Sequence, residues 1–199
     1  MSSRERAGSS ILSLLGTVAL AVVIAVLLRT FVVGVYQVPS GSMLDTIQIG
    51  DLLVGEKVSL RFEPPRQGDV VTFDSPRDPA TTLIKRVVAT EGQQVDLRDG
   101  VLYVDGVAEE ASYTEGKPTY SLSDMEGSAG IQYPYVVPAG CVFVMGDNRT
   151  NSADSRYFGP VSVKAVTSRA LFIYWPFQDV GTLCPHGHGR NSIAREGLP

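Results

Sequence analysis

Apolar residues form one long run near the N-terminus and many short runs after it. From Ile11 to Leu28 the chain reads ILSLLGTVALAVVIAVLL, with no charge and only Ser, Gly and Thr as interruptions. A helix over this run would be about 27 Å long, and the FVVGVY stretch after Arg29 and Thr30 extends it to the roughly 30 Å hydrocarbon thickness of a bilayer. The pattern predicts a transmembrane anchor over residues 11–33.

A cleavable secretory signal is the alternative interpretation of this segment. Such signals have an apolar region of only about 7 to 15 residues and a small-x-small cleavage site, whereas bulky residues follow this run. We therefore expect the anchor to be retained. Arg4 and Arg6 precede it, which favours a cytoplasmic N-terminus (residues 1–10) and an exterior location after Tyr36, although Arg29 at the far end weakens the charge asymmetry.

After Gln37 the pattern changes to short apolar runs separated by Gly, Pro and Asp, which is typical of β-strands. The sequence thus predicts an all-β domain over residues 34–180, with little room for long helices. The predicted strands lie within 51–60, 68–76, 82–90, 93–106, 135–147 and 164–175.

One hairpin is predicted in the segment VDLRDGVLYVDG, with Asp99-Gly100 as its two-residue turn. The apolar positions expected to alternate along it are Val95, Leu97, Val101 and Tyr103. Residues 107–130 are polar and lack periodicity, so we expect an extended loop or short hairpin there and predict no function for it. Residues 181–199 have the composition of a flexible tail.

Composition and charge narrow the functional classes. The 199 residues, 44% hydrophobic and 19% charged, fit one folded domain with a short attachment, and the net charge of −4 argues against nucleic-acid binding. Cys141 and Cys184 lack the spacing of metal ligands; they are either two buried thiols or a disulfide. The only histidines, His186 and His188, lie in the predicted tail and have no third ligand at a useful spacing, so no metal site is expected.

The position of those histidines also makes a Ser-His-Asp triad poorly supported. Of the four lysines, only Lys85 lies within an apolar strand pattern, LIKRVV. A lysine acts as a base only when it is neutral, and burial provides this by lowering its pKa. The alternative is a surface lysine at a strand edge whose apolar stem packs against the protein.

Two further segments carry polar groups suited to catalysis. In VPSGSML, Pro39 and Gly41 shape a tight loop around Ser40 and Ser42, which could present a hydroxyl and a backbone N–H to one carbonyl. Ser-Gly-Ser is also common in linkers, so this segment alone is weak support. The segment GDNRTNSADSR (146–156) follows the apolar strand CVFVM and is dense enough in polar residues to suggest a hydrogen-bonded scaffold.

Together, PSGSM after an N-terminal anchor, IKR in a strand and GDNRxNSxDSR near the end resemble bacterial type I signal peptidases. The order and spacing of these motifs extend the resemblance over nearly the whole chain, and IGD (49–51) and YFGPV (157–161) also match. Thr150 departs from the family, which often has Asp there. The family fold implied is an all-β domain of coiled antiparallel sheets.

The resemblance implies a role for each matching residue. Ser42 would be the nucleophile, Lys85 the general base, and Ser152 the hydroxyl that orients the lysine. Ser40 and the backbone N–H of Ser42 would form the oxyanion hole. Asp154 is expected to pair with Arg156 and, as a second option, with Arg86. The residues expected to support the site structurally are Asp147, Asp154, Arg86 and Arg156.

The function implied is a membrane-bound serine endopeptidase that removes signal peptides from secreted preproteins after small residues, at A-x-A-like sites. It would need no cofactor, would have the bilayer and preproteins as partners, and would act as a monomer on the outer side of the cytoplasmic membrane. One alternative is a self-cleaving repressor with related Ser-Lys chemistry, which the apolar N-terminus disfavours. Another is an inert membrane-tethered β-domain that binds exported proteins.

Overall fold

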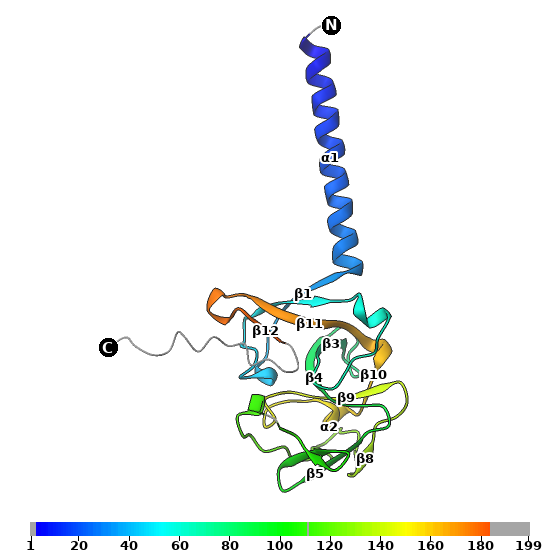
Figure 1. The fold of residues 1–199 in the computed structure, drawn as a ribbon, viewed down its shortest axis with the longest axis vertical. Coiled ribbons are helices and arrows are strands. Elements are labelled where there is room, and N and C mark those ends of the chain that lie inside the picture. The colour runs from blue at the N-terminus through cyan, green and yellow to red at the C-terminus, as the bar shows by residue number, and fades with distance from the viewer. Residues whose placement is uncertain (1–2, 111, 184–199) are drawn as a thin grey trace, which may run out of the picture.

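A long helix leads directly into a β-rich body in the computed structural model, which describes residues 3–110 and 112–183 (Figure 1). The helices are α1 (Ser3–Phe31) and the short α2 (Ser155–Phe158). The strands are β1 (Val33–Gln37), β2 (Leu52–Glu56), β3 (Val70–Asp74), β4 (Thr82–Thr90), β5 (Gln94–Arg98), β6 (Val101–Val104), β7 (Val107–Ala108), β8 (Tyr135–Val136), β9 (Cys141–Met145), β10 (Val161–Ser162), β11 (Val166–Trp175) and β12 (Gly181–Thr182). Short 3-10 turns cover Gly41–Met43, Ser59–Arg61, Ser112–Thr114, Val163–Ala165 and Phe177–Asp179.

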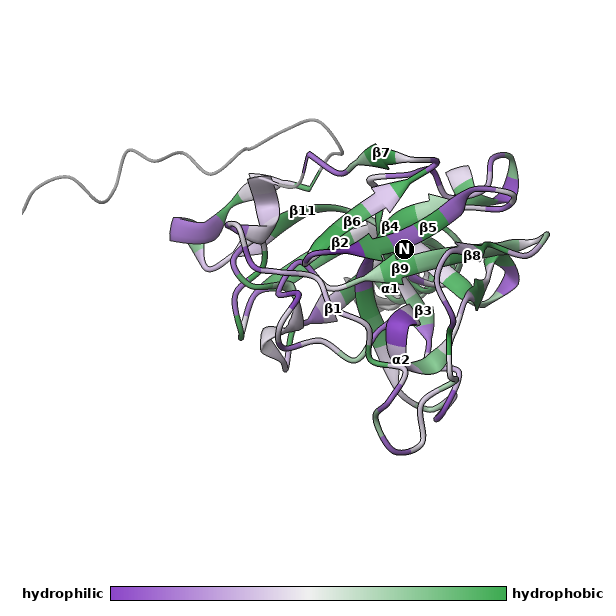
Figure 2. Ribbon diagram, turned by 90° about the horizontal axis from the view of Figure 1, so that it is seen from below, coloured by the Kyte–Doolittle hydropathy of each residue, from purple (hydrophilic) through white to green (hydrophobic). Residues whose placement is uncertain are grey.

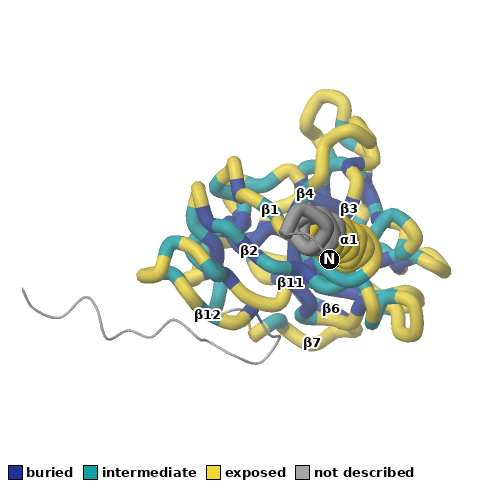
Figure 3. Tube along the Cα trace, turned by 90° about the horizontal axis from the view of Figure 1, so that it is seen from above, coloured by how far each residue is buried: buried dark blue, intermediate teal, exposed yellow. Residues whose placement is uncertain are grey.

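Helix α1 projects away from the body (Figure 1), and its residues from Ser13 to Phe31 are all exposed, as the yellow colour of the helix in Figure 3 indicates. This 19-residue stretch is long and apolar enough to cross a bilayer, the only such helix among the described residues. The helix ends at Phe31, two residues before the predicted end of the anchor, because Val33 already pairs with Glu56 in the sheet.

The larger sheet has eight strands in the order β1-β2-β11-β3-β4-β9-β10, with β12 paired to β11. Every ladder is antiparallel, so the predicted all-β class is confirmed. Strand β4 is central, and six consecutive residues from Ile84 to Ala89 are buried, since core clusters cover both of its faces. Apolar strands run through the interior of the body while polar loops surround it (Figure 2).

The smaller sheet, in the order β7-β6-β5-β8, contains the predicted hairpin. Its turn is at Asp99-Gly100, and both residues have the positive φ angles that a two-residue turn requires. The expected apolar face was wrong in β6. Because Arg98 pairs with Val101, the inward residues opposite Leu97 and Val95 are Leu102 and Val104, whereas Val101 is exposed.

The C-terminal boundary also differs from the expectation. Gly181 and Thr182, assigned to the tail from composition, pair with Ile173 and Phe172 as β12, and Leu183 is buried in the core. Three residues too few were therefore assigned to the domain. Cys184, His186 and His188 lie outside the described residues, so the predictions about them stay predictions.

Candidate active site

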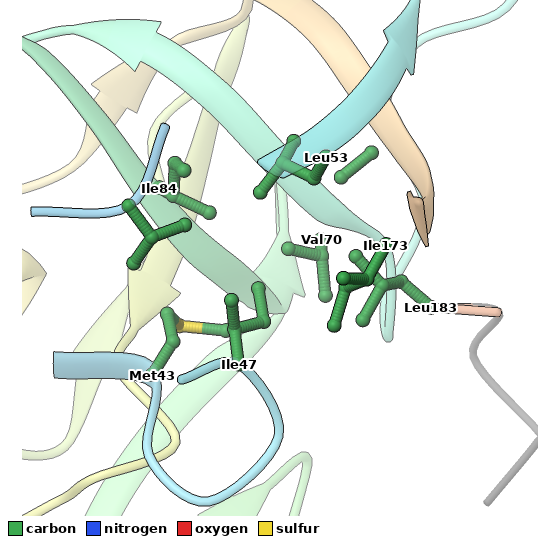
Figure 4. Packing of buried hydrophobic residues seen from close by; sticks show 9 residues of the cluster. Met43, Ile47, Leu53, Val70, Ile84, Ile173 and Leu183 are labelled. Atoms are coloured by element: carbon green, nitrogen blue, oxygen red, sulfur yellow. The ribbon is translucent and has the colours of Figure 1, made fainter. Parts of the chain in front are cut away.

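Ser42 lies in a short turn that a hydrophobic anchor fixes to the core. It is the middle residue of the 3-10 turn Gly41–Met43, which follows β1. The next side chain, Met43, and then Ile47 enter the core cluster that also contains Ile84 (Figure 4). Burying a side chain of this size stabilises the fold by about 1.5–3 kcal/mol, so the turn is held firmly while Ser42 itself stays partly accessible.

Lys85 follows Ile84 on β4, so the residues next to both functional groups belong to the same core cluster. The Lys85 side chain is buried, with 3% of the residue exposed. Its Nζ lies 2.7 Å from Ser42 Oγ and donates a hydrogen bond to the Ile84 carbonyl at 2.9 Å. A buried amine thus contacts a hydroxyl that substrate can reach.

Burial lowers the pKa of Lys85 to about 8, because an ammonium group loses hydration in the core. The carboxylates of Asp154 and Asp147 oppose this shift, since nearby negative charge favours the charged amine. The net effect leaves a substantial fraction of the amine neutral at mildly alkaline pH, and a neutral amine can accept the hydroxyl proton of Ser42.

Asp147 and Asn148 connect the strand end of β9 to the Ser42 turn. Asp147 is fully buried; it accepts two hydrogen bonds from the Arg86 guanidinium, at 2.9 and 2.7 Å, and one from Thr46 Oγ1 at 2.6 Å. The Asn148 side chain donates to the Gly41 carbonyl at 2.9 Å, and its backbone N–H donates to the Ser42 carbonyl at 3.1 Å. These bonds fix the backbone on both sides of Ser42.

A second buried ion pair joins Asp154 to Arg156. Both contacts between the carboxylate and the guanidinium are 2.8 Å long, and Asp154 also accepts the Gly146 N–H at 3.0 Å. The expected pairing of Asp154 with Arg156 is present, whereas the second option, Asp154 with Arg86, is not: Arg86 binds Asp147 instead. Each carboxylate near Lys85 is engaged by its own arginine, and losing one partner of such a pair typically costs about 3–5 kcal/mol.

Gly146 packs tightly between Ser152 and the Ser42 turn. A Cβ atom at this position would overlap Ser152 Oγ and the Ser42 carbonyl oxygen, so only glycine allows this approach. Ser152 Oγ is buried and has no hydrogen-bond partner among the residues that the structure describes. Ser152 thus lies beside the Ser42 turn, and no hydrogen bond joins its Oγ to Lys85.

Residues of the segment 107–130, for which the sequence indicated no function, extend this network. Glu109 forms an ion pair with Arg149 at 2.7 Å and accepts a hydrogen bond from the Tyr113 hydroxyl, and burial raises the pKa of that tyrosine. The Tyr113 ring lies 4.1 Å from the Arg86 guanidinium. No periodicity or motif identifies these residues in the sequence. Their contacts with Arg149 and Arg86 join positions that are distant along the chain, and a local pattern does not record such contacts.

A further ion pair joins this segment to the chain just after the Ser42 turn. Lys117 Nζ forms an ion pair with Asp45 at 3.0 Å, three residues after Ser42. Both side chains are partly exposed, so the pair adds little stability, but it ties the loop to the turn.

The remaining candidate groups are Ser40, Cys141 and side chains that could bind a metal ion. Ser40 is exposed next to the Ser42 turn, with an extended backbone. Cys141, at the start of β9, is half-buried and forms no disulfide with any residue that the structure describes. Within residues 3–110 and 112–183, no group of three His, Cys, Asp or Glu side chains is arranged to hold a metal ion. The site offers a hydroxyl, a buried amine and backbone N–H groups, which together are suited to acyl transfer.

Comparisons with known proteins point in one direction. The family model described as "Signal peptidase, peptidase S26" matches residues 11–175. The "Signal peptidase I" of Leptolyngbya laminosa is 34% identical, over 92% of this chain and 89% of the relative. The "Probable signal peptidase I-1" of a Synechocystis strain is 40% identical, over 82% of each chain.

A solved structure is also similar in sequence. It is the crystal structure of a signal peptidase I from Enterococcus faecalis, which is 32% identical and matches 54% of this chain and 97% of its own, with a TM-score of 0.43.

Proposed function

The chain belongs to the signal peptidase family, peptidase S26, and removes signal peptides from secreted preproteins; we propose that it does so with Ser42 as nucleophile and Lys85 as general base. The observation that carries this assignment is the 2.7 Å contact between Lys85 Nζ and Ser42 Oγ, made by a lysine that is 3% exposed. The same contact argues against an inert β-domain, because burying an amine costs free energy and binding alone does not require an amine buried against a partly accessible hydroxyl.

Ser42 Oγ attacks the scissile carbonyl as neutral Lys85 takes its proton. The resulting ammonium then protonates the departing amine of the mature protein, which leaves an acyl-enzyme on Ser42. In the second half, Lys85 takes a proton from water as the water attacks the acyl carbon, and the ammonium then returns a proton to Ser42 Oγ as the signal peptide leaves with a free carboxylate. One lysine thus serves both half-reactions.

The oxyanion formed in each half-reaction needs donors on the exposed side of the turn. The N–H of Ser42 lies in the first turn of a 3-10 helix, where backbone donors have no intrahelical partner. Together with the exposed hydroxyl of Ser40, it supplies the proposed oxyanion hole. We assign the lysine-orienting hydroxyl to Ser152: its Oγ is buried beside the Ser42 turn and has no other hydrogen-bond partner among the described residues, so it is free to turn toward Lys85.

The protein acts at a membrane as a monomer, with residues 1–10 in the cytoplasm, α1 crossing the cytoplasmic membrane and the β-domain outside. The exposed apolar stretch of α1 from Ser13 to Phe31 and the two arginines that precede this stretch in the sequence support this arrangement. The substrate is held in the same bilayer by its own apolar signal segment. Proximity then replaces tight binding, and specificity needs only small residues before the cut.

The proposed function is tested with a preprotein that carries an Ala-x-Ala site and is inserted in lipid vesicles. We expect the purified full-length chain to cut after the second alanine, as shown by the N-terminal sequence of the product. A preprotein with bulky residues in place of both alanines is the matched control and should stay intact. Binding of the preprotein without cleavage would favour the inert-domain alternative.

The pH dependence provides a separate prediction. Because burial lowers the pKa of Lys85 to about 8, the neutral base becomes more abundant as pH rises through this value. We expect kcat/KM, measured with a soluble peptide, to rise about tenfold per pH unit below pH 8 and to level off above it. A profile that is flat between pH 6 and pH 9 would contradict Lys85 as the base.

A further inference from the structure

The junction between the membrane helix and the peptidase domain contains no flexible linker. Helix α1 ends at Phe31 and β1 begins at Val33, which pairs at once with Glu56 of β2 (Figure 1). Val32, the one residue between them, is bonded on both sides: its N–H donates to the Leu28 carbonyl of α1, and its own carbonyl accepts the Lys57 N–H just after β2, both at 2.9 Å. The helix therefore continues directly into the sheet that carries the active site.

Two cationic side chains of the domain bind the end of this helix. Lys57 Nζ donates to the carbonyls of Arg29 and Thr30, at 3.2 and 3.3 Å. Arg61 donates to the Phe31 carbonyl at 3.1 Å, and its guanidinium lies 5.6 Å from the centre of the Phe31 ring. The last carbonyls of a helix have no intrahelical donors and carry partial negative charge, so cations at this end are favourable.

A polar cluster connects the Arg61 turn to the main sheet. Arg61 ends the 3-10 turn Ser59–Arg61, and the Glu56 carboxylate accepts hydrogen bonds from both the Ser59 N–H and its hydroxyl. Arg169 of β11 donates to Ser59 Oγ and to Asp69. The residues that hold the helix are thus attached to β2 and β11, which lie between β1 and the strands that position Lys85.

We propose that Lys57 and Arg61 are positioning residues that clamp the peptidase domain to its membrane helix and so fix the height of Ser42 above the bilayer. This inference rests on the proposed function. Ser42 follows the helix end by 11 residues, and β1 within that stretch is paired along its whole length. Because the substrate is anchored in the same bilayer, a fixed height aligns the nucleophile with a cleavage site at a set distance from the membrane.

The clamp is tested with the full-length double variant Lys57→Ala/Arg61→Ala in phosphatidylcholine vesicles. Two substrates are compared: a preprotein inserted in the vesicles and a soluble peptide that spans the same Ala-x-Ala site. We expect cleavage of the preprotein to fall by roughly tenfold or more, since small misplacements of reacting groups carry costs of this order. Cleavage of the peptide should stay as in the wild type.

Two further variants serve as matched controls. Arg66→Ala removes a nearby exposed arginine that pairs with Glu63, and it should cleave both substrates normally. Lys57→Arg/Arg61→Lys keeps a cationic donor at each position and should recover most of the preprotein cleavage.

Three results would overturn the clamp. One is an equal loss for both substrates, which would mean that the active site itself is disturbed, and another is no loss for either. The third is a loss that appears only after phosphatidylglycerol is added to the vesicles, which would mean that the cations bind anionic headgroups instead. If the wild type cleaves neither substrate, the proposed function fails and this inference fails with it.

Discussion

Ser42→Ala is expected to abolish cleavage of both preprotein and peptide, with kcat reduced by roughly 10⁴-fold or more, the scale on which serine proteases lose activity without their nucleophile. The variant removes only Oγ, whose side-chain contact is with Lys85 Nζ at 2.7 Å. The packing of Met43 and the backbone bonds from Asn148 remain. The loss of activity should therefore come without a loss of stability.

The measurement is single-turnover cleavage of the preprotein, read together with the thermal unfolding midpoint of each variant. Ser121→Ala is the matched control, because Ser121 is exposed and its hydroxyl forms hydrogen bonds with Ser123 alone among the described residues. The assignment would be supported if Ser42→Ala had the same thermal unfolding midpoint as the wild type but did not cleave the preprotein. Residual cleavage within tenfold of the wild type would mean that another group is the nucleophile.

The sequence allowed accurate prediction of elements whose signals are local. The 18-residue apolar run determines a membrane-length helix by itself, and Asp99-Gly100 determines a two-residue turn, since both residues adopt positive φ there. The expected inward positions in β6, Val101 and Tyr103, were wrong because the two-residue turn sets the register of the hairpin. Pairing of Arg98 with Val101 shifts the inward positions by one, to Leu102 and Val104.

The strand order and the C-terminal boundary could not be derived in this way. Strand β11 lies between β2 and β3, although more than 90 residues separate it from β3 in the chain, and no local pattern encodes such a pairing. The boundary was placed too early because Gly181 and Thr182 are short of apolar character. Their strand forms by pairing with Phe172 and Ile173 of β11, beyond the part of β11 that pairs with β3, and Leu183 then lies in the core.

The candidate site likewise contains residues that the sequence identified and supporting residues that it did not. Ser42, Lys85 and the 146–156 segment lie in motifs that could be recognised along the chain. The supporting contacts from Glu109, Tyr113 and Lys117 come from a segment without periodicity, and their partners are distant in sequence. A carboxylate in a polar loop has no sequence feature that distinguishes a buried partner of Arg149 from a solvated surface charge.

Lys85→Arg is expected to fold but to lose activity by about 10²–10⁴-fold, the usual contribution of a general base. The guanidinium stays protonated at every accessible pH, so it cannot take the Ser42 proton however close it lies. Its positive charge keeps the electrostatic balance with Asp147 and Asp154, which a neutral substitution would not. The variant therefore tests proton transfer rather than charge.

Lys164→Arg makes the same exchange at an exposed lysine and should retain full activity and stability. Because arginine is larger than lysine and the Lys85 site is closely packed, Lys85→Met provides a second, neutral variant with a similar stem. Both Lys85 variants should cleave the peptide slowly, without the rise in kcat/KM through pH 8 that the wild type shows. If Lys85→Arg kept that rise, the group that titrates near pH 8 would have to be another residue, and Lys85 would be a structural cation instead of the base.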